Sequence, residues 1–168
     1  TDLYPATRSQ ALPGDILDLN SIGSLRGISW TDDSLHIGAL TTWRDIIDAK
    51  LPPWLHALTM AAREVGGKQI QNVATVGGNL CNASPAADGT AALLALNASV
   101  QLQRVGEVRD LAVGDFVLGN RSTVIRPDEL LCAINIPLPS TNAKSTFLKL
   151  GARRYLVISI VMVAAMIE

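Results

Sequence analysis

The segment from residue 74 to residue 89 is the part of this sequence whose residue types and spacing best fit a chemical task. Gly77 and Gly78 are adjacent, and the side-chain donors of Thr75 and Asn79 flank them. Adjacent glycines can adopt positive φ and approach a ligand closely, so that successive backbone N–H groups converge on an anion. The pattern therefore predicts a loop whose amides cradle the phosphates of a nucleotide cofactor.

Asp88 follows Asn79 by nine residues and precedes an apolar segment, residues 90–96, that is predicted to form a short helix. A carboxylate at this place either caps the first turn of the helix or accepts hydrogen bonds from ligand hydroxyls. Both interpretations suit a nucleotide-binding site, and the sequence leaves both open.

Two common phosphate-binding motifs do not fit these glycines. They do not follow the Gly-x-Gly-x-x-Gly spacing directly between a strand and a helix, which a dinucleotide-binding Rossmann turn requires. A P-loop needs a lysine followed by Ser or Thr after its glycines, whereas Lys68 comes before them. A Gly-Gly pair by itself is also typical of an ordinary tight turn.

The whole 74–89 segment resembles the second flavin-binding motif of the FAD subunits of molybdenum hydroxylases, the family of the xanthine dehydrogenase and carbon monoxide dehydrogenase medium subunits. That motif runs Thr-[Val/Ile]-Gly-Gly-Asn, several residues, Ala-Ser-Pro, two residues, Asp, and every position is filled here. Four further segments are similar to the family, so that the resemblance covers nearly the whole chain: residues 15–28, 35–42, 126–137 and 149–155.

The resemblance implies an α+β fold of the two-subdomain FAD-binding type shared with vanillyl-alcohol oxidase, also called PCMH-type. Residues 1–50 would complete an N-terminal subdomain, and residues 51–168 would form the second subdomain with the Gly-Gly-Asn motif. The family's first Gly-Gly loop would end where this sequence begins, and its C-terminal domain would follow residue 168. We therefore expect the 168-residue chain alone to bind FAD weakly or not at all.

The resemblance also implies a function. A molybdopterin-binding large subunit would oxidise substrate, a 2Fe–2S small subunit would relay electrons, and this FAD domain would pass them to an acceptor such as NAD or oxygen. The chain would then be an oxidoreductase component that is inactive without its partner subunits. A stand-alone flavin oxidase of the same fold and a flavin-free scaffold that binds partners are the alternatives.

The family motif predicts nine cofactor-binding residues and no catalytic residue or metal ligand. Ser84 and Asp88 map near the ribityl chain and the phosphates. Tyr155 lies either against the isoalloxazine or at an ordinary strand edge, while Lys149, like Arg153, either balances the charge of the reduced flavin or is a solvated surface charge. The remaining five would hold the pyrophosphate: Thr75, Val76, Gly77, Gly78 and Asn79.

The composition fits one compact cytoplasmic domain. The chain has 168 residues, of which 48% are hydrophobic and 17% charged, and a formal net charge of −1. Its 14 Lys and Arg residues form no basic cluster, which argues against a nucleic-acid partner.

Cys81 and Cys132 are too far apart in sequence to form a Cys-x-x-Cys metal site. We expect no signal peptide, because residues 1–5 lack a basic n-region and an apolar h-region. The apolar residues 156–167 fall short of the roughly 20 needed to span a bilayer, so we expect them to form a buried strand.

Hydrophobic periodicity and breaker residues predict the elements that must position these groups. Helices are expected mainly in the first half, with Thr41 or Thr42 capping one of them, and strands mainly in the second half, which indicates an α+β layout. In chain order we expect a turn at 12–15, strands at 16–19 and 34–39, helices at 43–47, 52–65 and 90–96, a hairpin at 100–108, and strands at 131–136, 147–151 and 158–167.

Overall fold

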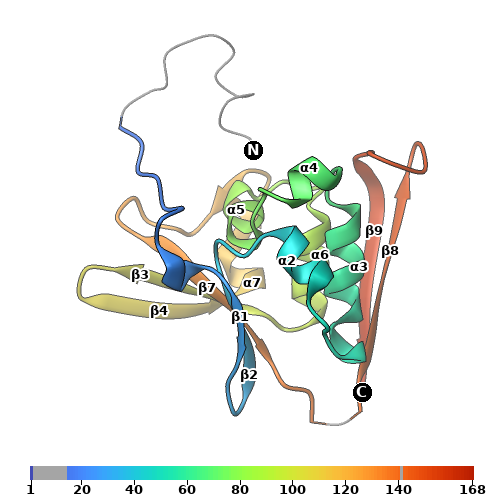
Figure 1. Ribbon diagram of the computed structural model, residues 1–168, viewed down its shortest axis with the longest axis horizontal. Helices are drawn as coiled ribbons and strands as arrows, with labels where there is room; N and C mark the ends of the chain where they lie inside the picture. Colours follow the sequence, from blue (N-terminus) through green and yellow to red (C-terminus); the bar gives the residue numbers. More distant parts are fainter. Residues whose placement is uncertain (2–14, 141) are drawn as a thin grey trace.

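The computed structural model describes residue 1, residues 15–140 and residues 142–168 (Figure 1). Most of the turn expected at 12–15 lies outside the described residues. The strand expected at 16–19 is wrong, because these residues form no regular structure. Ile16 and Leu17 are 55% and 76% exposed, so their apolar side chains are not part of any sheet face.

A five-stranded antiparallel sheet forms one layer of the fold, with the strand order β1-β2-β7-β3-β4. It confirms the predicted strand at 34–39, the hairpin at 100–108 and the strand at 131–136. Because β2 pairs with β7, residues before and after position 50 share one sheet. The strands are β1 (Ile28–Trp30), β2 (Ser34–Gly38), β3 (Ser99–Arg104), β4 (Glu107–Ala112) and β7 (Leu130–Pro137).

Helices form the middle layer. Thr42 caps the first α-helix through a capping box, in which Thr42 Oγ1 accepts from the Asp45 amide at 3.1 Å and Asp45 Oδ2 accepts from the Thr42 amide at 2.9 Å. The predicted break at the proline pair and the helix after it are also confirmed. The helices are η1 (Gly23–Leu25), α2 (Trp43–Asp48), η2 (Pro53–Leu55), α3 (His56–Glu64), α4 (Lys68–Gln71), α5 (Val76–Asn82), α6 (Asp88–Ala95) and α7 (Val113–Phe116).

A two-stranded ribbon, β8 (Lys144–Gly151) and β9 (Ser159–Ile167), forms the third layer and covers α3 and α6 (Figure 1). On its inner face β8 is buried around Phe147, which is only 2% exposed, and β9 is half-buried. Its outer face is open, and Leu148 and Val163 are 68% and 57% exposed. The expectation of a buried strand at the end of the chain is wrong, because the residues of β9 are half-buried on the side that faces the helices and exposed on the other side. A further short pair is formed by β5 (Val117–Gly119) and β6 (Ser122–Thr123).

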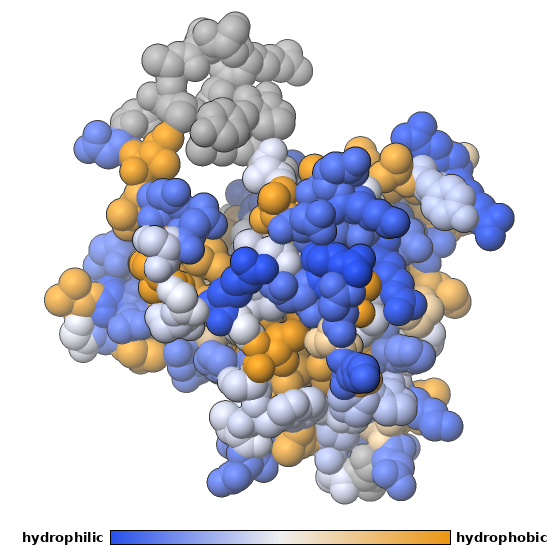
Figure 2. All heavy atoms as spheres, viewed as in Figure 1, coloured by the Kyte–Doolittle hydropathy of each residue, from blue (hydrophilic) through white to orange (hydrophobic). Residues whose placement is uncertain are grey.

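One hydrophobic cluster joins the three layers. It includes Leu35 and Ile37 from the sheet, Trp43 from α2, Leu93 from α6 and Phe147 from the ribbon. In the view of Figure 2 the surface is largely hydrophilic, and hydrophobic residues gather in small separate patches. The core thus extends from the sheet through the helices to the ribbon and holds α5 and α6 in fixed positions.

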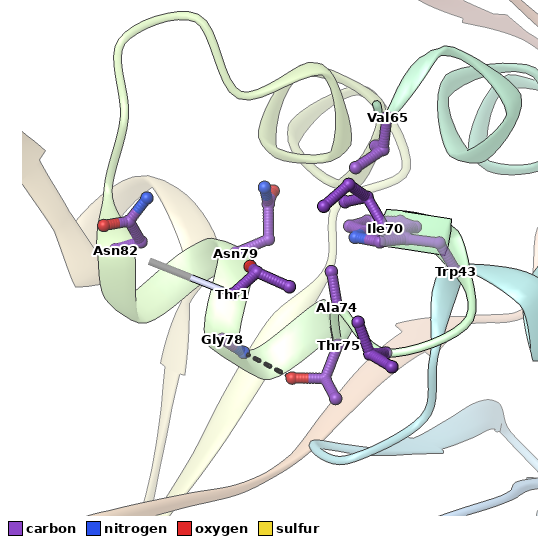
Figure 3. A pocket seen from close by; sticks show the side chains of 10 residues that line it. Thr1, Trp43, Val65, Ile70, Ala74, Thr75, Gly78, Asn79 and Asn82 are labelled. Atoms are coloured by element: carbon purple, nitrogen blue, oxygen red, sulfur yellow. Dashed lines mark hydrogen bonds between the residues drawn. The ribbon is translucent and has the colours of Figure 1, made fainter. Parts of the chain in front are cut away.

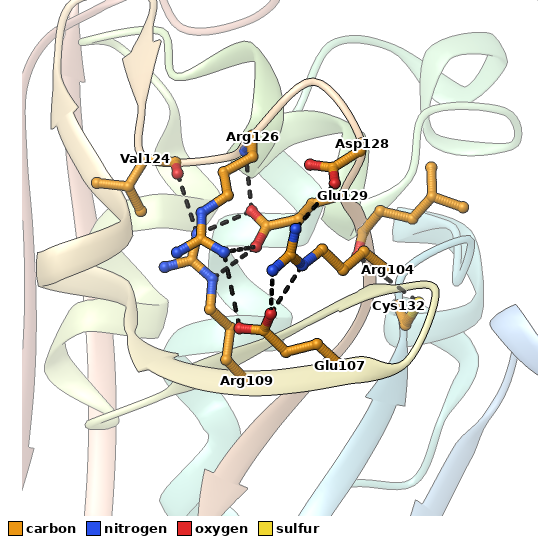
Figure 4. A network of polar contacts seen from close by, with 9 residues as sticks. Arg104, Glu107, Arg109, Val124, Arg126, Asp128, Glu129 and Cys132 are labelled. Atoms are coloured by element: carbon orange, nitrogen blue, oxygen red, sulfur yellow. Dashed lines mark hydrogen bonds and ion pairs between the residues drawn. The ribbon is translucent and has the colours of Figure 1, made fainter.

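A network of ion pairs fixes the segment before β7 to the β3–β4 hairpin (Figure 4). Glu129, whose side chain is 1% exposed, accepts from Arg109 at 2.7 and 2.8 Å and from the Arg126 amide at 2.8 Å. Arg109 also donates to the Val124 carbonyl at 3.1 Å. The bidentate Arg109 guanidinium is the main reason why the pKa of Glu129 is lowered to about 2.

Candidate functional site

Two adjoining hollows of about 240 and 460 Å³ lie beside α4 and α5. They share the walls formed by Val65, Ile70, Asn79 and Asn82, and we call them together the α4–α5 groove. The smaller hollow is shown in Figure 3. The larger one alone is within the range of about 300–1,000 Å³ that is usual for small-molecule sites.

Six of the nine predicted cofactor-binding residues line this groove, five of them from the 74–89 segment and one from β8. They are Thr75, Gly78, Asn79, Ser84, Asp88 and Lys149. The fold therefore brings most of the predicted site together. Val76 and Gly77 are buried behind the groove, and Tyr155 lies outside it.

The glycine pair does not form the predicted loop. Gly77 and Gly78 lie in the first turn of α5, neither has positive φ, and Thr75 is the N-cap residue, whose Oγ1 accepts from the Gly78 amide at 3.1 Å. The sequence does contain a sign of this helix. Thr75 stands three residues before Gly78, which is the spacing between an N-cap residue and the amide that its side chain accepts from.

The other amides of the turn are also satisfied inside the protein. The Val76 and Gly77 amides donate to the carbonyls of Thr41 and Ala39, each at 2.9 Å, and the Asn79 amide donates to the Thr75 carbonyl at 3.0 Å. The predicted cradle of free amides is therefore wrong. These bonds use the amides to attach α5 to the segment that follows β2.

Close packing explains the glycines instead. A Cβ on Gly77 would lie 2.7 Å from the Cβ and the carbonyl oxygen of Ala39, and a Cβ on Gly89 would lie 2.3 Å from the Trp43 ring. Gly78 is different, because it faces the groove and its Cβ would meet only Thr75 Oγ1, at 2.9 Å. Because Gly77 has no side chain, α5 can pack against Ala39 at the end of β2. Because Gly89 has none, α6 can pack against Trp43.

Asp88 and Lys149 form a buried ion pair at one end of the groove. Lys149 Nζ lies 2.6 Å from Asp88 Oδ2, and the two side chains are 7% and 6% exposed. Ser159 Oγ lies 2.5 Å from Asp88 Oδ1, and Lys149 also donates to the Glu64 carbonyl at 3.3 Å.

This pair decides two questions that the sequence left open. Asp88 is the first residue of α6, and its side chain makes no capping bond, so the cap interpretation is wrong. Lys149 is not a solvated surface charge either. Ser159 belongs to this cluster, but no motif marks it, because only the pairing of β8 with β9 brings it close.

Tyr155 and Arg153 lie on the connection between β8 and β9. Tyr155 is 69% exposed, and the Arg154 guanidinium carbon lies 5.5 Å from the centre of its ring. Arg153 donates to the carbonyls of Tyr155 at 3.0 Å and Leu156 at 2.6 Å, which stabilises the connection itself. Leu156, rather than Tyr155, reaches the wall of the groove.

The groove offers the chemistry that a flavin nucleotide needs. Ser84 supplies a hydroxyl, Lys149 an ammonium group and Gly78 an open approach. Asn79 Oδ1 and Trp43 Nε1 are buried in the described structure without hydrogen-bond partners, and both residues line the smaller hollow. Among the described residues, no group of three or more His, Cys, Asp and Glu gathers as a metal site.

Residues 1–139 match the model of the family described as the FAD binding domain in molybdopterin dehydrogenase. The chain belongs to this family. FAD is therefore the cofactor of the domain, and the α+β FAD-binding fold that the sequence predicts is confirmed.

Named relatives agree with the family. The nicotinate dehydrogenase FAD-subunit of Eubacterium barkeri is 34% identical over 153 residues, which are 89% of this chain and 52% of the relative. The carbon monoxide dehydrogenase medium chain of Afipia carboxidovorans is 34% identical over 154 residues, which are 88% of this chain and 52% of the relative. The chain thus spans about half the length of these relatives.

Solved structures show the same fold. The reconstituted CO dehydrogenase from Oligotropha carboxidovorans has a TM-score of 0.81 at 32% identity, over 94% of this chain and 56% of that chain. Quinoline 2-oxidoreductase from Pseudomonas putida 86 has a TM-score of 0.80 at 26% identity, over 88% of this chain and 51% of that chain. Within the described residues, no helix has the length and apolar character needed to cross a membrane.

Proposed function

We propose that this chain is the FAD-binding part of a molybdenum-containing hydroxylase or dehydrogenase and that the α4–α5 groove is where it binds FAD. The single observation that carries the proposal is that five residues of the 74–89 segment and Lys149, from β8, line one groove. Bound FAD would supply the redox chemistry by accepting and releasing electrons.

In this proposal the residues of the chain bind and orient the cofactor. Gly78 leaves the groove open beside Thr75, and Asn79 and Ser84 offer hydrogen bonds to polar groups of the nucleotide. Lys149 provides positive charge, which Asp88 partly offsets and holds in place. Since the α5 amides are already bonded, side chains carry more of the binding than the sequence predicted.

The wider role that we propose rests on the family. Electrons would pass from a partner molybdopterin-binding large subunit through a 2Fe–2S small subunit to FAD, and from FAD to an external acceptor such as NAD or oxygen. Co-purification of the full-length protein from its native cells with two subunits that carry these groups would support this role. A full-length protein that purifies alone and oxidises a substrate without partners would contradict it.

The FAD site is tested by replacing Gly78 with valine in the full-length protein. A β-branched side chain at this position would project into the groove and crowd the Thr75 hydroxyl, so we expect FAD affinity to fall by more than about tenfold. The measurement is flavin absorbance per protein after purification, followed by titration of the flavin-free protein with FAD.

Gly114→Val is the matched control. Gly114 is exposed in the first turn of α7, outside the groove, and a Cβ there would meet only Leu94 at an ordinary 3.6 Å. This variant should retain full FAD content. Thermal unfolding identifies any variant that fails to fold. Equal flavin content in the native protein and a folded Gly78→Val variant would remove the groove assignment.

A further inference from the structure

A hydrogen bond joins the start of β9 to the ion pair at one end of the α4–α5 groove. Ser159 Oγ donates to Asp88 Oδ1 at 2.5 Å, and Lys149 Nζ lies 2.6 Å from Asp88 Oδ2. Each carboxylate oxygen of Asp88 therefore has a donor from the ribbon. Asp88 and Lys149 line the groove, whereas Ser159 is not part of its lining.

The pairing of the ribbon is irregular beside Ser159. Gly151 pairs with Ser159, whereas its neighbour Leu150 pairs with Val161, so that β9 contains one more residue than β8 at this place. The irregularity has the form of a β-bulge, in which the extra residue changes the face to which the next side chains point. Bulges are common beside functional sites, where they re-aim a side chain.

The extra residue, Ile160, decides which side chain faces the helices. Side chains of a regular strand alternate between its two faces, so Met162 and Ile160 would lie on the same face. Instead Met162 and Ser159 are half-buried, and Ile160 is 66% exposed. Without the bulge an isoleucine would face the helices and the serine would face outward. The bulge thus brings a hydroxyl group to the buried Asp88 carboxylate.

The ion pair depends on such donors because little water reaches it. The side chains of Lys149 and Asp88 are 7% and 6% exposed, and charges in such surroundings are stable when they are paired and hydrogen-bonded. With one donor on each oxygen, the carboxylate satisfies both in a single orientation. Loss of the Ser159 hydroxyl would remove one donor from a buried charge and let the carboxylate turn, and the Lys149 ammonium group with it.

We propose that Ser159 is a positioning residue of the α4–α5 groove. Its hydroxyl fixes the orientation of the Asp88 carboxylate, and this carboxylate holds the Lys149 ammonium group at the wall of the groove. This role rests on the proposed function, because a fixed charge at this wall serves FAD binding. The motif marks Asp88 and Lys149, but it marks no residue of β9.

Two matched substitutions at position 159 of the full-length protein test this role. Threonine and valine have nearly the same shape, but only threonine keeps the hydroxyl. We expect Ser159→Thr to bind FAD like the native protein and Ser159→Val to raise the Kd about 2- to 10-fold, the range that corresponds to one hydrogen bond. Titration of the flavin-free protein with FAD, followed by flavin fluorescence, gives the Kd.

A double-mutant cycle shows whether the hydroxyl acts through the ion pair. In a protein that already carries Lys149→Met, the Kd values of Ser159→Val and Ser159→Thr should differ by less than about twofold, because the ammonium group that the serine positions is gone. A purely structural effect of the valine would be the same in both backgrounds.

A second measurement does not need FAD. Reductive methylation of the flavin-free protein, followed by peptide mass spectrometry, reports how readily the Lys149 amine reacts. The amine should be protected in the native protein and in Ser159→Thr, because it is buried beside Asp88. It should react several-fold faster in Ser159→Val, where the carboxylate that holds it is free to turn.

Ser145→Ala is the control, because Ser145 is also a buried serine of the ribbon but accepts from the Ala57 amide at 2.8 Å and lies outside the groove. It should lower the melting temperature without changing the Kd or the methylation of Lys149. Equal Kd values, or equal methylation rates, for folded Ser159→Val and Ser159→Thr would overturn the inference. If the native full-length protein does not bind FAD, the proposed function fails, and methylation still tests whether Ser159 positions Lys149.

Discussion

Glu129 is the residue whose charge the fold controls most strongly. Arg109 holds its pKa at about 2, well below its ordinary value of 4.5. A carboxylate with a lowered folded-state pKa adds stability above its unfolded-state pKa and loses it as the pH falls. The stabilisation should therefore be complete above about pH 4.5 and disappear progressively towards pH 2.

Glu129→Gln tests this prediction. The variant should be less stable than the native protein in urea unfolding at pH 7, and the difference should shrink between pH 4.5 and pH 2. Asp128→Asn is the control, because the Asp128 side chain is 60% exposed beside Arg104 and surface pairs contribute little. A difference between the native protein and Glu129→Gln that stays constant down to pH 2.5 would contradict the ion-pair account.

Gly77 shows why the motif needs a glycine inside a helix. Alanine normally stabilises a helix relative to glycine, yet a Cβ here would lie 2.7 Å from Ala39. We expect Gly77→Ala to lower the free energy of unfolding by about 1–3 kcal/mol, the usual cost of overpacking. Gly114→Ala, with 3.6 Å of room, should be neutral or stabilising by up to about 1 kcal/mol in the same urea unfolding experiment. Equal stabilities of the two variants would show that α5 does not depend on this close approach.

At the scale of elements, the ribbon of β8 and β9 has one face that stabilises the fold and one that does not. Phe147 and Leu148 are neighbours on β8 with exposures of 2% and 68%. We expect Phe147→Ala to cost about 3–5 kcal/mol because it empties part of the core, and Leu148→Ala to change stability by less than about 1 kcal/mol. Chemical denaturation of both variants checks this, and similar losses would mean that the outer face is also covered.

The sequence was most informative where an element carries its own local signals. A helix cap at Thr41 or Thr42, the proline break at residue 52 and the alternating hairpin at 100–108 are all predicted, because each depends on residues close together in the chain. Helix α5 has a local sign in its cap residue Thr75, but the bonds of its Val76 and Gly77 amides to the Thr41 and Ala39 carbonyls depend on residues that only the fold brings near. The open side of β9 was missed for the same reason, since it depends on which face the helices cover.

The sequence predicts which residues lie at the candidate site better than it predicts what each of them does there. The motif identified six residues that the fold gathers around one groove, although the reason given for the glycines was wrong. Ser159 and Trp43 carried no sequence signal. Their places depend on strand pairing and on the packing of α6, which no local pattern encodes.

At the scale of the whole molecule, three layers hold the groove. The sheet anchors α5 through the segment after β2, and the ribbon supplies Lys149 and Ser159 to the buried Asp88. The helices and the ribbon thus line the groove, while the sheet holds α5 in place behind it.

A crystal structure of the full-length protein with FAD tests this account most directly. We predict density for the nucleotide along the α4–α5 groove, beside Gly78 and in contact with Asn79 and Ser84, with the Asp88–Lys149 pair at one end. FAD bound away from these residues, or bound with the groove closed by side chains, would contradict the central claim.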